Sequence, residues 1–140
     1  MKKTVFTSKI TCKTKDGKEI PKYKLVIFRQ YDMYCYNEKK QEYHIVALYG
    51  EYILSHIEYL LDNDPERIQE QIDKGTLYRY LREVERKARK VVDSQVEKWK
   101  QNNEEIIKAH NSGDIQKEGA LINGLKLMAE EIMYPCVIYA

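Results

Sequence analysis

The chain has 140 residues, of which 43% are hydrophobic and 33% charged, and its 24 Lys and Arg nearly balance its 22 Asp and Glu. This length predicts one domain with enough chain for a buried core, and the near-neutral balance removes bulk charge as an argument for nucleic-acid or membrane partners. No apolar run approaches the roughly 20 residues that span a bilayer. No secretory leader follows Met1 and the three cysteines are widely spaced, so we expect reduced thiols in a cytoplasm.

Residues 4–48 show the two-residue periodicity of β-strands. A first strand is predicted over 6–12, where the apolar residues share one face. Asp16-Gly17 predicts a tight hairpin turn, because both central positions of such a turn need positive φ. Pro21 should mark a strand start or an edge. Further strands are predicted over 23–28, 31–36 and 43–48, which gives a small antiparallel sheet of three or four strands over residues 1–48.

After Gly50 the apolar period changes to about 3.6 residues, which predicts helices. Asp64-Pro65 is a typical helix start, with a capping carboxylate and a proline at the first helical position. Gly75 should end that helix, Asp114 should cap the last one and Pro135 should stop it. The apolar tail 136–140 suggests docking rather than fraying. The four expected helices cover about 51–61, 65–74, 76–110 and 114–134, and we expect this helical region, 49–140, to pack with the sheet as one domain.

Charge is distributed unevenly: residues 1–48 carry eleven Lys and Arg against five acids, and the remainder carries 13 against 17. The predicted sheet also holds five tyrosines. Exposed rings on a cationic sheet suit single-stranded nucleic acid, which stacks its bases on them, and they suit protein recognition equally. A solvated sheet edge that blocks aggregation would give the same pattern. The candidate binding residues in this region are Lys22, Tyr23, Lys24, Arg29, Tyr31, Tyr34, Tyr36, Lys39 and Lys40.

The predicted long helix offers two further surfaces. Arg79, Arg82, Arg86 and Arg89 are spaced three, four and three residues apart, so they share one helix face that either reads phosphates or is simply solvated. An apolar stripe follows the other side, on a rod of roughly 50 Å at about 1.5 Å per residue. Because this exceeds the roughly 30 Å width of a compact domain, we expect a partner or a second copy to cover part of it, most simply as a homodimer. The predicted oligomer interface is Val92, Val96, Trp99 and Ile106.

No catalytic motif accompanies these features, so we predict a protein that is not an enzyme and has no cofactor or metal. No histidine stands at zinc-ligand spacing from another histidine or a cysteine. His56 lies beside the apolar face of its helix and reads as a packing residue. Glu130-Glu131 would need a second acidic cluster to form a hydrolytic site, and the sequence places none.

Segments of the second part of the chain carry a family resemblance. They are Leu48-Tyr49-Gly50, Leu60-Leu61, the stretch from Ile72 through Lys74-Gly75-Thr76-Leu77 to Leu81, and the endings Met128-Ala129-Glu130-Glu131-Ile132 and Val137-Ile138-Tyr139-Ala140. Over residues 47–140 the chain resembles TnpV, a family of small proteins encoded on transposons and other conjugative elements of Firmicutes-type bacteria. The resemblance implies a mobile-element setting, a bacterial cytoplasm, and accessory work beside nucleic acid or host-defence machinery. It implies no catalytic residues.

We therefore predict an α+β fold, with a small antiparallel sheet followed by four helices of which the third is longest. The predicted function is that of a non-enzymatic accessory protein of a mobile genetic element, which binds nucleic acid or a nucleoprotein complex through the basic sheet and the long helix. The alternative is an anti-defence inhibitor, comparable to an anti-CRISPR protein, that blocks a host nuclease by protein contact.

Overall fold

The computed structural model describes residues 3–140 and confirms an α+β fold with one long helix. The chain forms two compact units, residues 1–83 and residues 84–140. The division falls within helix α3 (Leu77–Gln101), whereas the sequence places the boundary between sheet and helices at 48/49. The first two helices thus belong to the same compact unit as the sheet.

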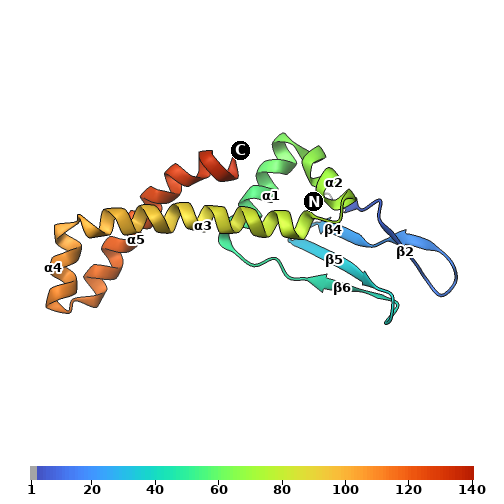
Figure 1. The fold of residues 1–140 in the computed structure, drawn as a ribbon, viewed down its shortest axis with the longest axis horizontal. Coiled ribbons are helices and arrows are strands. Elements are labelled where there is room, and N and C mark those ends of the chain that lie inside the picture. Colours follow the sequence, from blue (N-terminus) through green and yellow to red (C-terminus); the bar gives the residue numbers. More distant parts are fainter. Residues whose placement is uncertain (1–2) are drawn as a thin grey trace. The chain divides into compact units, whose positions relative to one another are not determined.

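Four antiparallel strands form the main sheet, in the order β1-β4-β5-β6 (Figure 1). Their bounds are Thr4–Thr7 for β1, Tyr23–Ile27 for β4, Tyr31–Asn37 for β5 and Glu42–Val46 for β6. Two short strands, β2 (Thr11–Lys13) and β3 (Glu19–Pro21), pair only with each other. The main sheet matches the predicted three or four strands, and the separate ribbon of β2 and β3 was not predicted.

The single strand predicted over 6–12 is wrong, because the chain leaves the main sheet at Ser8. This buried hydroxyl accepts a hydrogen bond from the Tyr23 amide at 3.0 Å and donates one to the Ile10 carbonyl at 2.7 Å. Both bonds satisfy polar groups at the bend, so the chain can turn out of one sheet and into the other.

The β2–β3 turn is at the predicted place but has a different geometry. Gly17 has a φ of 79°, whereas Asp16 does not have positive φ. The Gly17 amide donates to the Thr14 carbonyl at 3.0 Å, and the Thr14 amide donates to the Lys18 carbonyl at 2.9 Å. This is the longer hairpin loop in which a type I turn is followed by one left-handed glycine.

The core of the first unit lies between the main sheet and the helices α1 (Glu51–Asn63), α2 (Pro65–Asp73) and the start of α3 (Figure 1). Leu25 and Met33 are opposite each other on β4 and β5 and point into it. The helices supply buried residues at three- and four-residue spacing, as the sequence predicts: Ile53, Ile57, Leu60, Ile68, Ile72, Leu77 and Leu81.

The second unit holds the rest of α3, then α4 (Glu104–Ser112), α5 (Ile115–Met133) and a π-helical turn over Tyr134–Ile138. The helix predicted over 76–110 is therefore two helices. The Asn103 side chain accepts the Ile106 amide at 3.0 Å and caps α4, which explains the break after Gln101. Pro135 does not stop the chain's helical path as predicted, since the π-helical turn continues through it and buries Ile138.

Candidate nucleic-acid interface

The β2–β3 and β5–β6 hairpins are tied together at one end of the first unit (Figure 1). The Gln41 side chain, in the β5–β6 turn, accepts the Lys15 amide at 2.8 Å and the Tyr36 hydroxyl at 3.1 Å. The Tyr43 hydroxyl donates to the Pro21 carbonyl on β3. The bonds to Lys15 and Pro21 join one hairpin to the other, across up to 26 positions of sequence, and hold the two hairpins side by side.

We call a set of seven lysines in this region the lysine tip: Lys13, Lys15, Lys18, Lys39 and Lys40 of the two hairpins, Lys22 directly after β3, and Lys24 on the adjoining strand β4. The sequence singled out the last four, and the structure brings them together with Lys13, Lys15 and Lys18 of the ribbon. The signal that was missed is the spacing of these three lysines on both sides of Asp16-Gly17, which places them all near one turn.

The positive charge of the lysine tip is weakly compensated. Of the five carboxylates on these two hairpins, Asp32 lies at the far end of β5 and accepts from Gln30, Glu38 faces the Cys12 thiol, and Glu42 lies 3.3 Å from His44 Nε2. The other two are Asp16 and Glu19. Within residues 3–140, no carboxylate forms an ion pair with a lysine of the tip. Lysines without carboxylate partners attract polyanions.

At the base of the lysine tip, the rings of Tyr36 and Tyr43 pack against each other and are covered by neighbouring groups. Tyr36 is buried and meets Tyr43 edge to face, with 5.1 Å between ring centroids. The Lys24 ammonium lies 4.2 Å above the Tyr43 ring. Burial raises the pKa of the Tyr43 hydroxyl, and burial followed by the hydrogen bond to Glu38 raises the pKa of the Cys12 thiol.

The predicted row of exposed tyrosines is therefore not present as predicted. Tyr36 has almost no accessible surface, and Tyr23 and Tyr31 pack against the helical core instead of facing solvent. Tyr34 stays half-buried on the outer face of the main sheet, opposite Lys24 on β4 and Ile45 on β6. Tyr23 and Tyr31 share the inward face with Leu25 and Met33, because alternate residues of a strand point to opposite faces. Tyr36 lies on the same face as Tyr34 and is buried by contacts that include Gln41 and Tyr43.

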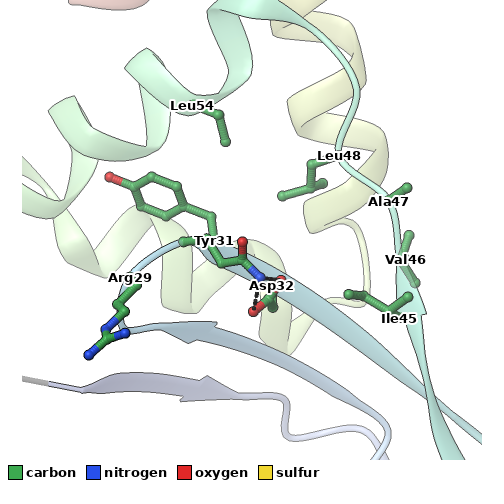
Figure 2. Close-up of a pocket in the computed structure, with 9 residues that line it drawn as sticks. Arg29, Tyr31, Asp32, Ile45, Val46, Ala47, Leu48 and Leu54 are labelled. Carbon is green, nitrogen blue, oxygen red and sulfur yellow. Dashed lines mark hydrogen bonds between the residues drawn. The ribbon is translucent and has the colours of Figure 1, made fainter.

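Arg29 belongs to a different part of the first unit. It follows β4 and precedes β5, so the full length of β5 separates it from the β5–β6 turn, roughly 20 Å at about 3.3 Å per residue. It lines an open pocket of about 360 Å³ beside Tyr31 and Leu54 (Figure 2). The walls are largely apolar, and the Asp32 carboxylate already accepts from Gln30, so few polar groups remain to orient a small ligand.

The arginine row on α3 is interleaved with acids and crosses the boundary between the two compact units. In the first unit, Arg79 is exposed and Arg82 lies over the Tyr78 ring at 5.9 Å. In the second, Arg86 is exposed, and Arg89 Nε pairs with the buried Glu85 carboxylate at 2.7 Å. Because its charges are partly neutralised, this row is a weaker phosphate-binding candidate than the lysine tip.

The predicted oligomer interface is only partly accessible. Val92 and Ile106 are buried within the single chain, so they offer no surface to a second one. Val96 and Trp99 are half-buried. Four exposed apolar side chains of the second unit lie on α5, at Ile115, Leu127, Met128 and Ile132, and two more are Ile107 on α4 and Tyr139.

His56 is a packing residue, as predicted. It is buried, and its Nε2 lies 2.7 Å from the Tyr80 hydroxyl of α3. A hydrogen bond with the same tyrosine is the main reason why the pKa of the Arg67 guanidinium is raised. Arg67 Nε is 3.3 Å from Asp64, whose side chain therefore pairs with an arginine and does not make the predicted capping bond.

Residues 3–140 hold neither a cluster of metal ligands nor a membrane-spanning helix. No group of three or more His, Cys, Asp or Glu side chains in this part of the chain is arranged to hold a metal ion. None of its helices combines the length and the apolar character that crossing a bilayer requires.

No family model, curated protein or solved structure matches the chain. The resemblance to TnpV proteins therefore stays a prediction from the sequence. What the fold and the site define is an α+β protein with a lysine-rich double hairpin at one end of its sheet.

Proposed function

We propose that this protein is a non-enzymatic accessory protein of a bacterial mobile genetic element, which works in the host cytoplasm and binds nucleic acid or a nucleoprotein complex through the lysine tip. The observation that carries the proposal is the set of seven lysines on two bonded hairpins and the adjoining start of β4, none of which pairs with a carboxylate of residues 3–140. The mobile-element setting rests on the TnpV resemblance alone.

Salt dependence of binding tests the electrostatic part of this proposal. Four to seven lysine–phosphate contacts predict that affinity falls about 10²–10⁴-fold between 50 and 200 mM salt, because each contact releases bound counterions. Fluorescence polarisation with labelled 20-nucleotide DNA and RNA measures this directly. The variant Lys15→Glu/Lys18→Glu should bind much more weakly than the wild type.

A matched control is available in the second unit. Lys108→Glu/Lys117→Glu makes the same change in net charge at two exposed lysines of α4 and α5. It should leave binding close to that of the wild type. If both double variants weaken binding equally, net charge and not the lysine tip is responsible.

The second candidate function is inhibition of a host nuclease by protein contact, and one observation favours it. The outer face of the main sheet exposes Val5 on β1 and Ile45 on β6, the latter with 62% of its surface accessible. These two strands are the edges of the sheet, and an exposed sheet edge can pair with a strand of another protein. In that case the protein should bind no free nucleic acid, yet it should co-purify from its host with a large partner that nuclease treatment does not remove.

A further inference from the structure

The aromatic rings near the lysine tip are not available for base stacking. Proteins that bind single strands stack successive bases on exposed rings. At this end of the sheet, Tyr36 is buried, and Tyr43 is covered by the Lys24 ammonium and held by its bond to Pro21. Tyr34 is the remaining ring on this face of β5, and it is half-buried. One half-buried ring does not make a path for consecutive bases.

The ribbon of β2 and β3 has instead the shape that enters a duplex groove. It is a two-stranded antiparallel sheet of its own, with three paired residues on each strand and an exposed turn at residues 15–18. Strands in such a ribbon lie roughly 4.8 Å apart. The major groove of B-form DNA, about 12 Å wide, admits a two-stranded ribbon, whereas the major groove of an RNA duplex is too narrow and deep.

The ribbon is also held in place before any partner binds. At its base the Lys22 amide donates to the Ile10 carbonyl at 2.8 Å, and the Tyr36 amide donates to the Lys22 carbonyl at 2.8 Å. Nearer the turn, Gln41 accepts the Lys15 amide. A ribbon that is already fixed loses little conformational freedom on binding, which favours affinity.

We infer that the lysine tip recognises B-form double-stranded DNA, with the β2–β3 turn in the major groove and the lysines of both hairpins on the phosphates that flank it. Lys13, Lys15 and Lys18 lie along the ribbon, and Lys39 and Lys40 extend the contact from the neighbouring turn. Asp16 stands at the exposed end of the ribbon, where it faces base edges, and a carboxylate there accepts a hydrogen bond from cytosine N4. This inference rests on the proposed nucleic-acid-binding function.

The test compares three labelled ligands of one sequence at 50 mM salt: a 20-base-pair DNA duplex, its single strand, and the corresponding RNA duplex. The DNA duplex should bind about tenfold or more tightly than either of the others. Lys15→Glu/Lys18→Glu should weaken duplex binding by about tenfold or more. Tyr34→Ala should change it by less than about twofold, because no base stacks on that ring. Circular dichroism and a thermal melt establish that each variant is folded.

The outcomes separate the inference from the function on which it rests. If the single strand binds as tightly as the duplex, or the RNA duplex as tightly as the DNA duplex, the groove assignment is wrong and the nucleic-acid-binding function stands. A loss of binding in Tyr34→Ala would likewise overturn it in favour of stacking. If none of the three ligands binds at 50 mM salt, the proposed function itself fails.

Discussion

Gln41 combines backbone strain with three side-chain hydrogen bonds. Its φ of 54° is the one positive φ of a non-glycine residue in the described part of the chain. Such a conformation costs about 1–2 kcal/mol for a residue with a Cβ. Its side chain accepts from Lys15 and Tyr36, and donates to the Glu38 carbonyl at 2.6 Å. The strain at this position is thus offset by the contacts that hold the two hairpins together.

Two substitutions at this position separate strain from hydrogen bonding. Gln41→Ala keeps the strained backbone and loses all three bonds, so the free energy of unfolding should fall by about 1–3 kcal/mol. Gln41→Gly loses the same bonds and removes the strain, so it should be about 1 kcal/mol more stable than Gln41→Ala. Urea unfolding of the two variants beside the wild type measures both differences. Equal stability of the alanine and glycine variants would show that the backbone is not strained.

The Cys12 thiol makes stability depend on pH in the alkaline range. Burial raises its pKa in the folded protein, so the unfolded chain loses this proton first as pH rises. The unfolded state then binds fewer protons than the folded state, and the free energy of unfolding falls as pH rises above the ordinary thiol pKa, about 8.5. Below that pH the contribution of the thiol is fully present.

Urea unfolding between pH 7.5 and 9.5 tests this effect. The wild type should lose stability across the range, and Cys12→Ala, although less stable at every pH, should lose less of it. Cys136→Ala serves as the control, because that thiol is exposed. Curves for wild type and Cys12→Ala that run parallel would show that ionisation of Cys12 is not coupled to unfolding.

At the scale of elements, a polar contact inside the helical core connects α1 to α3. The Tyr80 hydroxyl meets the buried His56 Nε2 at 2.7 Å and also bonds to Arg67 of α2. Tyr80→Phe keeps the ring and removes both bonds, so the free energy of unfolding should fall by about 1–3 kcal/mol. Tyr49→Phe, at a side chain with 70% of its surface exposed, should change it by less than about 0.5 kcal/mol. Chemical denaturation measures both, and an unchanged Tyr80→Phe variant would mean that this contact adds no net stability.

The sequence predicts elements well where one local signal dominates. Pro65 and Gly75 bound α2 almost as predicted, and the apolar spacing of α1 correctly places Ile53, Ile57 and Leu60 in the core. Leu54, which the same spacing places inward, is exposed. The sequence predicts the bounds of an element poorly where a hydrogen bond between distant residues determines them. Ser8 divides one predicted strand through its bonds to Tyr23, 15 residues away, and nothing within residues 6–12 shows this.

The candidate site was predicted in part for the same reason. Charge could be counted along the sequence, so Lys22, Lys24, Lys39 and Lys40 were identified. The exposure of the tyrosine rings could not be predicted from the sequence, because it depends on which strand covers which face of the sheet. Tyr36 is buried under contacts that involve Gln41 and Tyr43, and these exist only once the two hairpins have met.

At the scale of the whole molecule, the charges of the first unit are separated. Residues 1–48 carry eleven basic residues against five acids, while residues 49–83, which form α1, α2 and the start of α3, carry four against eight. Such a separation of charge orients a protein in the field of a polyanion, with the lysine tip toward it and the acidic helices away. Residues 84–140 are balanced, at nine of each sign, so they add no net attraction.

Oligomeric state is the property of the whole molecule that the long helix bears on most directly. The apolar stripe of α3 is partly buried in the single chain, and its accessible remainder includes Val96 and Trp99. We expect these residues to pair with a second copy, because an aromatic ring contributes a large contact area to an interface. Light scattering at tens of micromolar should then report about twice the 16.7 kDa of one chain.

Trp99→Glu should return the mass to that of one chain while the thermal melt shows a folded protein. As a control, Lys15→Glu/Lys18→Glu should leave the mass unchanged. A wild type with the mass of one chain at that concentration would contradict the dimer, and a Trp99→Glu variant that still dimerises would move the interface away from α3, to the exposed apolar residues of α5.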